Sequence, residues 1–296
     1  MTIETGTALL MVGPVTIDHI GGRQQPGGPV SYGAAVATAF GLRARILTIA
    51  SAEADLSPLE GHDVELVEDR GTVTFAFTDG PDGRAMRVPE QPSRPLAASD
   101  LPDAWSTPST FMIAPLIRGD VDVDSFVPIA RSASRVGVIM QGLQRELVGD
   151  EVQITLPRDN SFIRTCSCSY SLFRSRREAG KWTDKQTEAV AKSGATLVTT
   201  LGSEGAEIQR GEHRFAVDPF PLDAEGDSTG AGDVFATALI LALDAGEQAA
   251  AQIAAAFAAA SVEQVGPQPL PTLDEIKQRI ASAQSDSDEN RRGDSV

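Results

Sequence analysis

The stretch of this 296-residue chain best suited to chemistry is a run of small residues between two aspartates, Asp227-Ser-Thr-Gly-Ala-Gly-Asp233. It stands directly before an apolar stripe with helical spacing, made of Ala236, Leu239, Ile240 and Leu243. The run is therefore predicted to begin a helix, where unpaired N–H groups and the helix dipole attract anions. Glycines at such a place let a phosphate approach the backbone closely.

An acid inside an anion site indicates a chemical role for Asp233. It can take a proton from a substrate hydroxyl while backbone N–H groups hold the charge of a transferring phosphoryl group. We therefore expect Asp233 to be the catalytic base, with the N–H groups from Gly230 through Ala231 and Gly232 to Asp233 forming the anion hole. The alternative is that residues 227–229 only cap the helix, which the full seven-residue string disfavours.

The surrounding chain alternates between buried strands and helices. Apolar runs of strand length recur near residues 9–15, 44–50, 110–114, 136–140, 169–173 and 195–201. Helical patterns lie between several of them, and the last third of the chain is helical. This alternation predicts an α/β fold with a largely parallel sheet covered by helices on both faces.

Residues 72–88 depart from that rhythm. Apolar and polar residues alternate on both sides of the turn Asp79-Gly-Pro-Asp-Gly83, which predicts a β-hairpin inserted into the α/β chain. The hairpin would serve as a lid or as an oligomerisation sheet. A sheet edge exposing Val73, Phe75 and Phe77 is a liability for a monomer, so we expect a homodimer through this sheet.

Composition limits the partners and the compartment. The net charge of −16 argues against a nucleic-acid surface, which needs clustered Lys and Arg. No apolar stretch is long enough to span a bilayer, and we expect no signal peptide. Cys166 and Cys168 are read as ordinary thiols of a cytoplasmic protein. No Gly-x-Gly-x-x-Gly follows the first strand, which disfavours a dinucleotide-dependent oxidoreductase.

Five segments together resemble the ribokinase-like (PfkB) carbohydrate kinase family. The string from Asp227 to Phe235 is similar to the family's C-terminal signature and is the most specific of the five. The others follow in the family's order: Asp18 after the first strand, Gly27-Gly28 before a helix, Gln-Gly-Leu-Gln-Arg at 141–145, and Thr-Thr-Leu-Gly-Ser-Glu-Gly-Ala at 199–206. The resemblance covers roughly residues 9–280.

The resemblance implies a doubly wound, mostly parallel sheet with helices on both faces and a small β-sheet lid. The kinase domain would cover residues 7–281, with lid strands inserted near residues 14–28 and 71–90. Residues 282–296 are rich in Ser, Asp, Glu and Arg, and they are expected to form a disordered tail.

The resemblance also implies an ATP-dependent kinase that phosphorylates a hydroxyl of a small sugar or polyol. Mg²⁺ would bridge the phosphates of ATP, with Glu178 acting on the metal through water. Asp227 matches a position at a monovalent-cation loop of ribokinase, so an optional cation such as K⁺ is expected there, and whether this chain keeps the loop is left open. ATP would lie along a turn formed by Thr200, Gly202, Ser203 and Gly205.

On the side of the phosphate acceptor, Asp18 matches the family's acidic residue that binds substrate hydroxyls. Gly27 and Gly28 match the glycine pair beside the substrate. Two positions depart from the family pattern. Tyr32 stands where many members carry Asn, and it either lines the pocket or packs in its helix. Ser175 replaces the Asn of an Asn-x-x-Glu motif.

These departures leave the nature of the acceptor open. Myo-inositol kinases of the family also lack the aligned Asn, which favours an inositol-like polyol. A nucleoside kinase of the same fold and a non-catalytic relative that binds small molecules are the alternatives. The basic cluster of Arg174, Arg176 and Arg177 is interpreted as a solvated face rather than a phosphate clamp.

Overall fold

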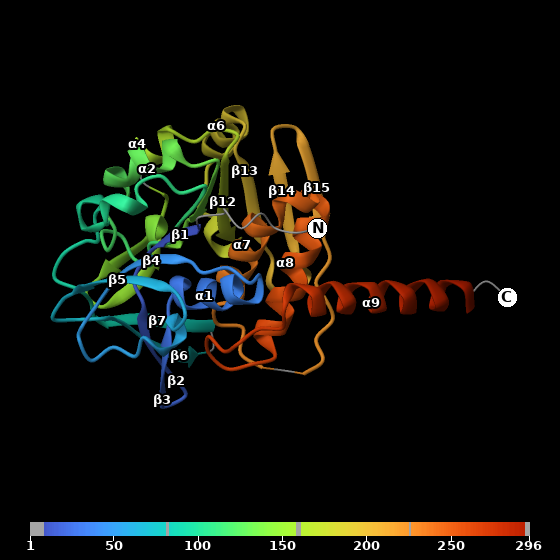
Figure 1. Ribbon diagram of the computed structural model, residues 1–296, viewed down its shortest axis with the longest axis horizontal. Coiled ribbons are helices and arrows are strands. Elements are labelled where there is room, and N and C mark those ends of the chain that lie inside the picture. Colours follow the sequence, from blue (N-terminus) through green and yellow to red (C-terminus); the bar gives the residue numbers. More distant parts are fainter. Residues whose placement is uncertain (1–8, 81–82, 158–160, 225, 294–296) are drawn as a thin grey trace.

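Two β-sheets organise the chain in the computed structural model, which describes residues 9–80, 83–157, 161–224 and 226–293 (Figure 1). Within these residues the larger sheet has the strand order β15-β14-β13-β12-β9-β8-β1-β4-β5. Neighbouring strands from β13 to β5 are parallel, and only β14 runs antiparallel to its neighbours. The strands are β1 (Leu9–Val12), β4 (Arg45–Ala50), β5 (Asp63–Glu68), β8 (Thr110–Ile113), β9 (Arg135–Ile139), β12 (Tyr170–Ser175), β13 (Thr196–Thr200), β14 (Ala206–Arg210) and β15 (His213–Val217).

Helices cover both faces of the larger sheet (Figure 1). Successive strand residues point to opposite faces, so the neighbours Leu10 and Met11 enter different cores. The fold class expected from the alternation of strands and helices is confirmed. One face packs against α1 (Pro29–Ala39), α7 (Ala231–Ala242) and α8 (Glu247–Val262), and the other against α2 (Val127–Ser132), α4 (Ser161–Arg164) and α6 (Asp184–Ser193).

The loops after the parallel strands gather at the carboxyl edge of this sheet, where open α/β sheets bind ligands. The short helix α3 (Gln141–Gln144) follows β9, and α5 (Arg176–Ala179) follows β12. A tight turn at Gly202–Glu204 follows β13, and Ser175 is the residue paired with Thr200 across these two strands. Two of the segments that resemble the kinase family, residues 141–145 and 199–206, are therefore brought to one edge.

The smaller sheet has the order β10-β11-β7-β6-β2-β3 and forms the lid. Two of its strands, β10 and β11, were not predicted, although the Gly149-Asp150 pair between them is a typical hairpin turn. Pro81 and Asp82 of the predicted hairpin turn lie outside the described residues. The strands are β2 (Thr16–Ile20), β3 (Arg23–Gly27), β6 (Val73–Gly80), β7 (Gly83–Glu90), β10 (Arg145–Val148) and β11 (Glu151–Ile154).

The exposed edge that motivated a dimer is not found. Strand β6 lies inside the lid sheet between β7 and β2. Val73 and Phe75 are buried and pack with Leu116 and Ile117, and Phe77 is partly buried against the same cluster. The apolar face of the hairpin is therefore covered by the chain's own loop, and the dimer stays a prediction without that premise.

The C-terminal helix α9 (Leu273–Gly293) runs through most of the segment predicted to be a disordered tail and projects from the body of the molecule (Figure 1). Its first turns are anchored by Ile276, which is fully buried. Once such a turn is formed, each added residue gains a hydrogen bond, so the helix extends past the packed part. The structure describes residues 282–293 as part of this helix, and the disordered tail stays a prediction; residues 294–296 lie outside the described residues, as do residues 7 and 8. No described helix is long and apolar enough to cross a membrane.

Candidate active site

Helix α7 begins within the predicted string, with Gly230 as its flanking residue in a left-handed conformation (φ +80°). A residue with a side chain adopts this conformation at a cost of about 1–2 kcal/mol. The ring of Tyr32 lies against the Gly230 Cα, so that a Cβ at this position would overlap the ring carbons. Backbone conformation and ring contact both require glycine at residue 230.

Two N–H groups of this helix start are available to a ligand. Asp233 N–H donates to the Gly230 carbonyl at 3.0 Å, and Ala231 N–H donates to Ser228 at 3.3 Å. Within the described part of the chain, no backbone acceptor lies within hydrogen-bond distance of the Gly230 and Gly232 N–H groups. Of the N–H groups predicted to form the anion hole, these two remain available, at the positive end of a 12-residue helix.

The carboxylate of Asp233 faces charged groups from three other segments. Its pKa is raised to about 7, chiefly by burial; Arg145 lowers the pKa, while the negative charges of Glu178 and Asp18 raise it. Gln141 Nε2 donates to Asp233 Oδ1 at 3.5 Å, a long contact from the end of β9. A carboxyl group with a pKa near neutrality is suited to accept and release a proton.

Asp18 lies on β2 and is buried at the junction of the lid and the core. Thr16 Oγ1 donates to its Oδ1 at 2.8 Å. A Cβ at Gly27 would overlap the Asp18 carboxylate, and one at Gly28 (φ +92°) would lie 2.7 Å from the Pro14 carbonyl oxygen. The first glycine of the pair therefore makes room for Asp18, and the second allows the tight approach of the chain that starts α1.

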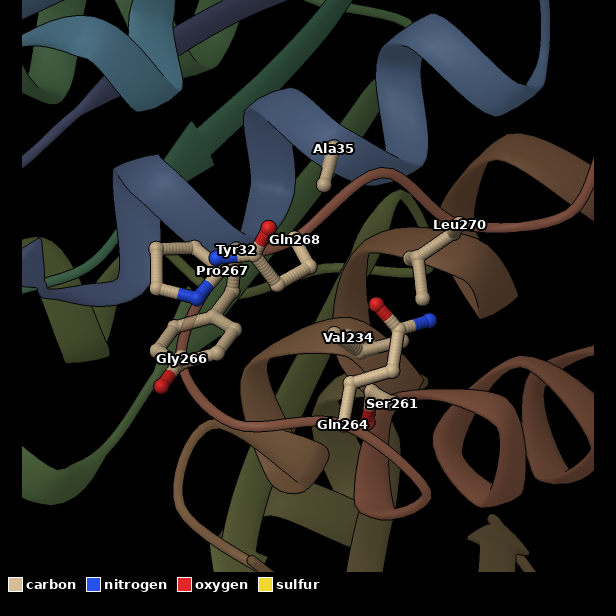
Figure 2. Close-up of a pocket in the computed structure, with 9 residues that line it drawn as sticks. All are labelled: Tyr32, Ala35, Val234, Ser261, Gln264, Gly266, Pro267, Gln268 and Leu270. Atoms are coloured by element: carbon tan, nitrogen blue, oxygen red, sulfur yellow. The ribbon is translucent and has the colours of Figure 1, made fainter.

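Tyr32 packs within the protein. Its side chain is buried, and Figure 2 shows its ring beside residues 266–268, with Val234 of α7 and Ser261 of α8 at the same hollow. This hollow has no room for a water molecule. This geometry agrees with the interpretation that Tyr32 packs in its helix, and the ring lies against Gly230.

Glu178 and Ser175 form a capping box at the start of α5. Ser175 N–H donates to Glu178 Oε2 at 2.7 Å, and Glu178 N–H donates to Ser175 Oγ at 3.3 Å. The other carboxylate oxygen of Glu178 lies 3.9 Å from Arg145 Nη2. The side chains of Arg145 and Glu178 are 16% and 6% exposed, so this is a pair of largely buried opposite charges.

A cavity of about 300 Å³ lies between the lid and these two residues. Its polar lining comes from both sheets: Arg145, Ser175, Arg177 and Glu178 near the core, and Arg87 and Glu151 on the lid. Apolar lid residues complete it, namely Ala85, Met86, Val152 and Ile154.

The arginine cluster after β12 divides into three different environments. The guanidinium of Arg174 lies over the Trp182 ring at 4.4 Å, and its Nε donates to Thr199 Oγ1 at 3.1 Å. Arg176 pairs with Glu204 at 2.6 Å, while Arg177 lines the cavity. The interpretation of the whole cluster as a solvated face is therefore wrong for Arg174, whereas Arg176 and Arg177 are exposed.

The predicted ATP turn lies one strand away from Ser175. Thr200 ends β13, and Gly202 (φ +65°) and Gly205 (φ +88°) bracket the turn that also contains Ser203. A Cβ at Gly205 would overlap the Val217 carbonyl, whereas the space around Gly202 is open. No described contact joins this turn to Asp233, although both lie at the carboxyl edge of the sheet.

Asp227 is held inside its own loop. Its Oδ1 accepts the N–H of Thr229 at 3.0 Å and the hydroxyl of Thr229 at 2.7 Å. The Asp227 N–H donates to the Gln264 carbonyl at 3.4 Å, which ties the loop to the end of α8. The carboxylate thus shapes the approach to α7.

The donor set around Glu178 fits a water-mediated magnesium ion better than a direct cage. Among the described residues no group of three His, Cys, Asp or Glu side chains is placed to hold a metal. Mg²⁺ keeps several waters and binds through one or two carboxylates together with substrate phosphates. Glu178, which faces the cavity, is the carboxylate that would serve it.

Sequence reasoning missed Gln141, Gln144 and Arg145 as site residues, although it had noted their segment. Gln144 is fully buried; its Nε2 donates to the carbonyls of Thr155 and Glu178, and its Oε1 accepts the Trp182 indole N–H. A glutamine and an arginine directly after a buried strand were the available signal, because that position falls at the carboxyl edge of the sheet.

The fold defines the class of protein. Solved structures that share it include a pyrophosphate-dependent kinase of the ribokinase family in complex with sulfate (TM-score 0.72, 20% identity, covering 88% of this chain and 96% of that chain). Arabidopsis thaliana ribokinase complexed with ribose and ATP is similar (0.69, 17%, 93% and 99%). So is a pyrophosphate-dependent myo-inositol-1 kinase converted by mutation into a myo-inositol-3 kinase (0.72, 18%, 93% and 99%). The chain has the ribokinase-like fold.

The C-terminal part of the sequence matches a family model. The model of the pfkB family carbohydrate kinases matches residues 158–273, which contain β12, the Gly202 turn and the start of α7. No curated protein matches the chain. The resemblance found in the motifs is therefore confirmed to this extent: residues 158–273 match the family model, and the chain shares the fold of solved ribokinase-family kinases.

Proposed function

We propose that this protein transfers a phosphoryl group from a phosphoanhydride donor to a hydroxyl group of a small polyol or sugar. One observation carries the proposal: the Asp233 carboxyl stands at a helix start where the N–H groups of Gly230 and Gly232 have no acceptor among the described residues, and its pKa of about 7, raised by burial, is lowered by the charge of Arg145. A base, an anion hole and a cation at one place are the parts that phosphoryl transfer needs.

Each residue has a task in this reaction. Asp18 accepts hydrogen bonds from hydroxyls of the acceptor and orients the reacting oxygen. Asp233 takes the proton from that oxygen as it attacks the phosphorus atom. The N–H groups of Gly230 and Gly232, with Arg145, hold the negative charge that spreads over the transferring group. Glu178 would hold Mg²⁺ through water, and the ion would supply positive charge to the donor phosphates.

The donor expected from the motifs is ATP along the turn from Thr200 to Gly205. The open space at Gly202 supports a ligand at this turn. Among the similar structures, one ribokinase is a complex with ATP and another kinase depends on pyrophosphate. The loop of Asp227 and Gln264 is the proposed place of an optional K⁺ ion.

The acceptor proposed is an inositol-like polyol. Tyr32, which stands where many family members carry Asn, is buried, and Asp18 then carries the recognition of hydroxyls. A similar structure is a kinase of myo-inositol, which supports the same class. A nucleoside acceptor and a non-catalytic binding role are the alternatives that experiment must separate.

A panel of acceptors tests the proposal. Purified protein is incubated with Mg²⁺ and either ATP or pyrophosphate, and with inositols, pentoses, hexoses, hexose phosphates and nucleosides in turn. Phosphorylated products are detected by mass spectrometry, so that donor hydrolysis is not mistaken for transfer. We expect a phosphorylated polyol that is absent with the Asp233→Asn variant. Binding of an acceptor without any phosphorylated product would instead favour the non-catalytic role.

A further inference from the structure

The cavity between lid and core is separate from the predicted ATP turn. Its lining residues come from β7, β10, β11, the last residue of β12 and the start of α5; none of Thr200, Gly202, Ser203 or Gly205 is among them, although Ser175 of the lining pairs with Thr200 across β12 and β13. A ligand in this cavity can therefore be held without touching the turn. Arg145 of its lining directly follows α3, and Gln141 at the start of α3 donates to Asp233 Oδ1 at 3.5 Å, which brings this side of the cavity near Asp233.

Arg145 is incompletely satisfied by the protein. A guanidinium carries five N–H donors, and buried donors normally have acceptors. Within the described residues, no acceptor lies within hydrogen-bond distance of the Arg145 guanidinium, and its nearest charge, Glu178, is 3.9 Å away. A largely buried guanidinium with unmet donors at a cavity wall indicates an anionic ligand.

Two further arginines point to the same kind of ligand. Arg177 lines the cavity and makes no ion pair or hydrogen bond with any residue that the structure describes. Arg87 enters from lid strand β7, where Glu151 holds it at 3.1 Å. Three arginines and two carboxylates, those of Glu151 and Glu178, line the cavity, and Asp150 lies 3.9 Å from Arg87 beside it.

We propose that this cavity is a phosphate-donor subsite that binds inorganic pyrophosphate, and that the protein uses pyrophosphate as a phosphoryl donor. Arg145 holds the phosphoryl group next to Asp233, Arg177 holds the distal phosphate, and Arg87 closes the subsite from the lid. Arginine suits this task because its planar fork binds phosphate oxygens in pairs. The inference rests on the proposed function and extends it to a donor without a nucleoside.

The transfer balances without another reactant. The oxygen of the acceptor hydroxyl forms a bond to the near phosphorus atom of pyrophosphate, and its proton passes to Asp233. The bond from that phosphorus to the bridging oxygen breaks, and its electron pair leaves with inorganic phosphate. The products are the phosphate ester and inorganic phosphate, and the proton on Asp233 returns to solvent or to the phosphate.

Calorimetric titration with pyrophosphate and with its non-hydrolysable analogue methylenediphosphonate tests the subsite without any acceptor. We expect Arg177→Gln to weaken binding about 10- to 100-fold, because a charge-assisted hydrogen bond to phosphate is lost. Arg145→Gln should weaken it at least as much; Arg177, being exposed, gives the test that does not depend on folding. Arg43→Gln is the matched control, since Arg43 is exposed and paired with Asp63 away from the cavity. Equal affinity of the wild type and Arg177→Gln would overturn the subsite.

Transfer assays then separate the inference from the function on which it rests. A phosphorylated polyol formed from pyrophosphate, with loss of that product in Arg177→Gln, supports the inference. Transfer from ATP but not from pyrophosphate would overturn the inference and leave the proposed function standing. Transfer from neither donor to any acceptor of the panel would overturn the proposed function and the donor role together.

Discussion

At one end of the site carboxylates and glycines are in tight contact, whereas at the other end arginines surround an open cavity. The acceptor end consists of Asp18, Gly27, Tyr32, Gly230 and Asp233. Here a single added Cβ at either glycine would overlap a neighbouring side chain. The donor end consists of Arg87, Arg145, Arg177 and Glu178, around a cavity of about 300 Å³.

The difference reflects the charges of the two substrates proposed for these ends. A neutral polyol is recognised by hydrogen bonds to fixed acceptors, so its site gains from tight packing of the groups that orient Asp18. A polyphosphate is recognised by positive charge, which needs space for the anion and its metal. Burial at the acceptor end raises the pKa of Asp233 to about 7, Arg145 from the other end lowers it, and Glu178 and Asp18 raise it further.

The largest effect is expected from substitution of Asp233, the proposed base of the acceptor end. Asp233→Asn keeps the shape of the side chain and removes the base, so we expect turnover to fall about 10²- to 10⁴-fold while pyrophosphate and ATP still bind. Product formation and donor titration are measured on the same preparation. Asp244→Asn, which alters an exposed partner of Arg135, is the matched control. Turnover within threefold of the wild type would remove Asp233 as the base.

The two glycines of the helix start, Gly230 and Gly232, differ in the space around them: Gly230 is confined by a neighbouring ring, and the space around Gly232 is open. Gly230→Ala places a Cβ against the Tyr32 ring in a left-handed conformation, so we expect a loss of unfolding free energy of about 1–3 kcal/mol. Gly232→Ala has no neighbour within 4 Å and should fold as well as the wild type. Its methyl group would crowd the available N–H groups, so its turnover should still fall. Urea unfolding and product assays distinguish the two effects, and equal stability of both variants would contradict the tight packing.

Asp18 links acceptor binding to the titration of Asp233. Asp18→Asn removes a negative charge that raises the Asp233 pKa, so the acid limb of kcat/KM should move from about pH 7 to lower pH. The wild-type rate should rise with pH through this limb, because Asp233 must be deprotonated to accept the proton. The KM for the acceptor should increase roughly tenfold, as one hydrogen bond to a charged group becomes a neutral one. An unchanged acid limb in Asp18→Asn would contradict the placement of Asp18 beside Asp233 at the acceptor end.

The acceptor end could be predicted more fully than the donor end, and the reason is local geometry. The residue types from Asp227 to Asp233 predict a helix start, and Gly27-Gly28 predicts a place where two backbone segments approach closely. Both predictions use local sequence alone. Arg145 was within a noted segment, yet its burial depends on β10 and β11, two short strands whose only sequence signal was Gly149-Asp150. The role of Arg87 depends on how the lid sheet meets the core, which no local pattern contains.

The smallest effect is expected at Asp120, which lies beneath the lid and acts on the stability of the fold through long-range packing. Asp120 Oδ2 accepts the N–H groups of Leu116 at 2.7 Å and Ile117 at 3.0 Å, and these two residues pack under lid strand β6. Burial raises the pKa of Asp120 from 3.8 to about 7, so the folded state retains a proton that the unfolded chain releases. The stability contributed by this proton is fully present below about pH 4 and is lost as the pH rises through 7.

Asp120→Asn should remove this part of the pH dependence while keeping an oxygen acceptor for both N–H groups. Urea unfolding at pH 5 and pH 8 measures it: the wild type should lose more unfolding free energy between the two values than the variant, with exposed Asp122→Asn behaving as the wild type. Arg118 follows Leu116 and Ile117 in the same loop, and its N–H donates to the Arg145 carbonyl at 2.8 Å. Deprotonation of Asp120 at high pH is expected to loosen this loop, and the change should affect Arg145 at the donor end before the acceptor end. Donor KM should therefore rise with pH in the wild type more than acceptor KM does, and a rise confined to the acceptor would reverse the assignment of the two ends.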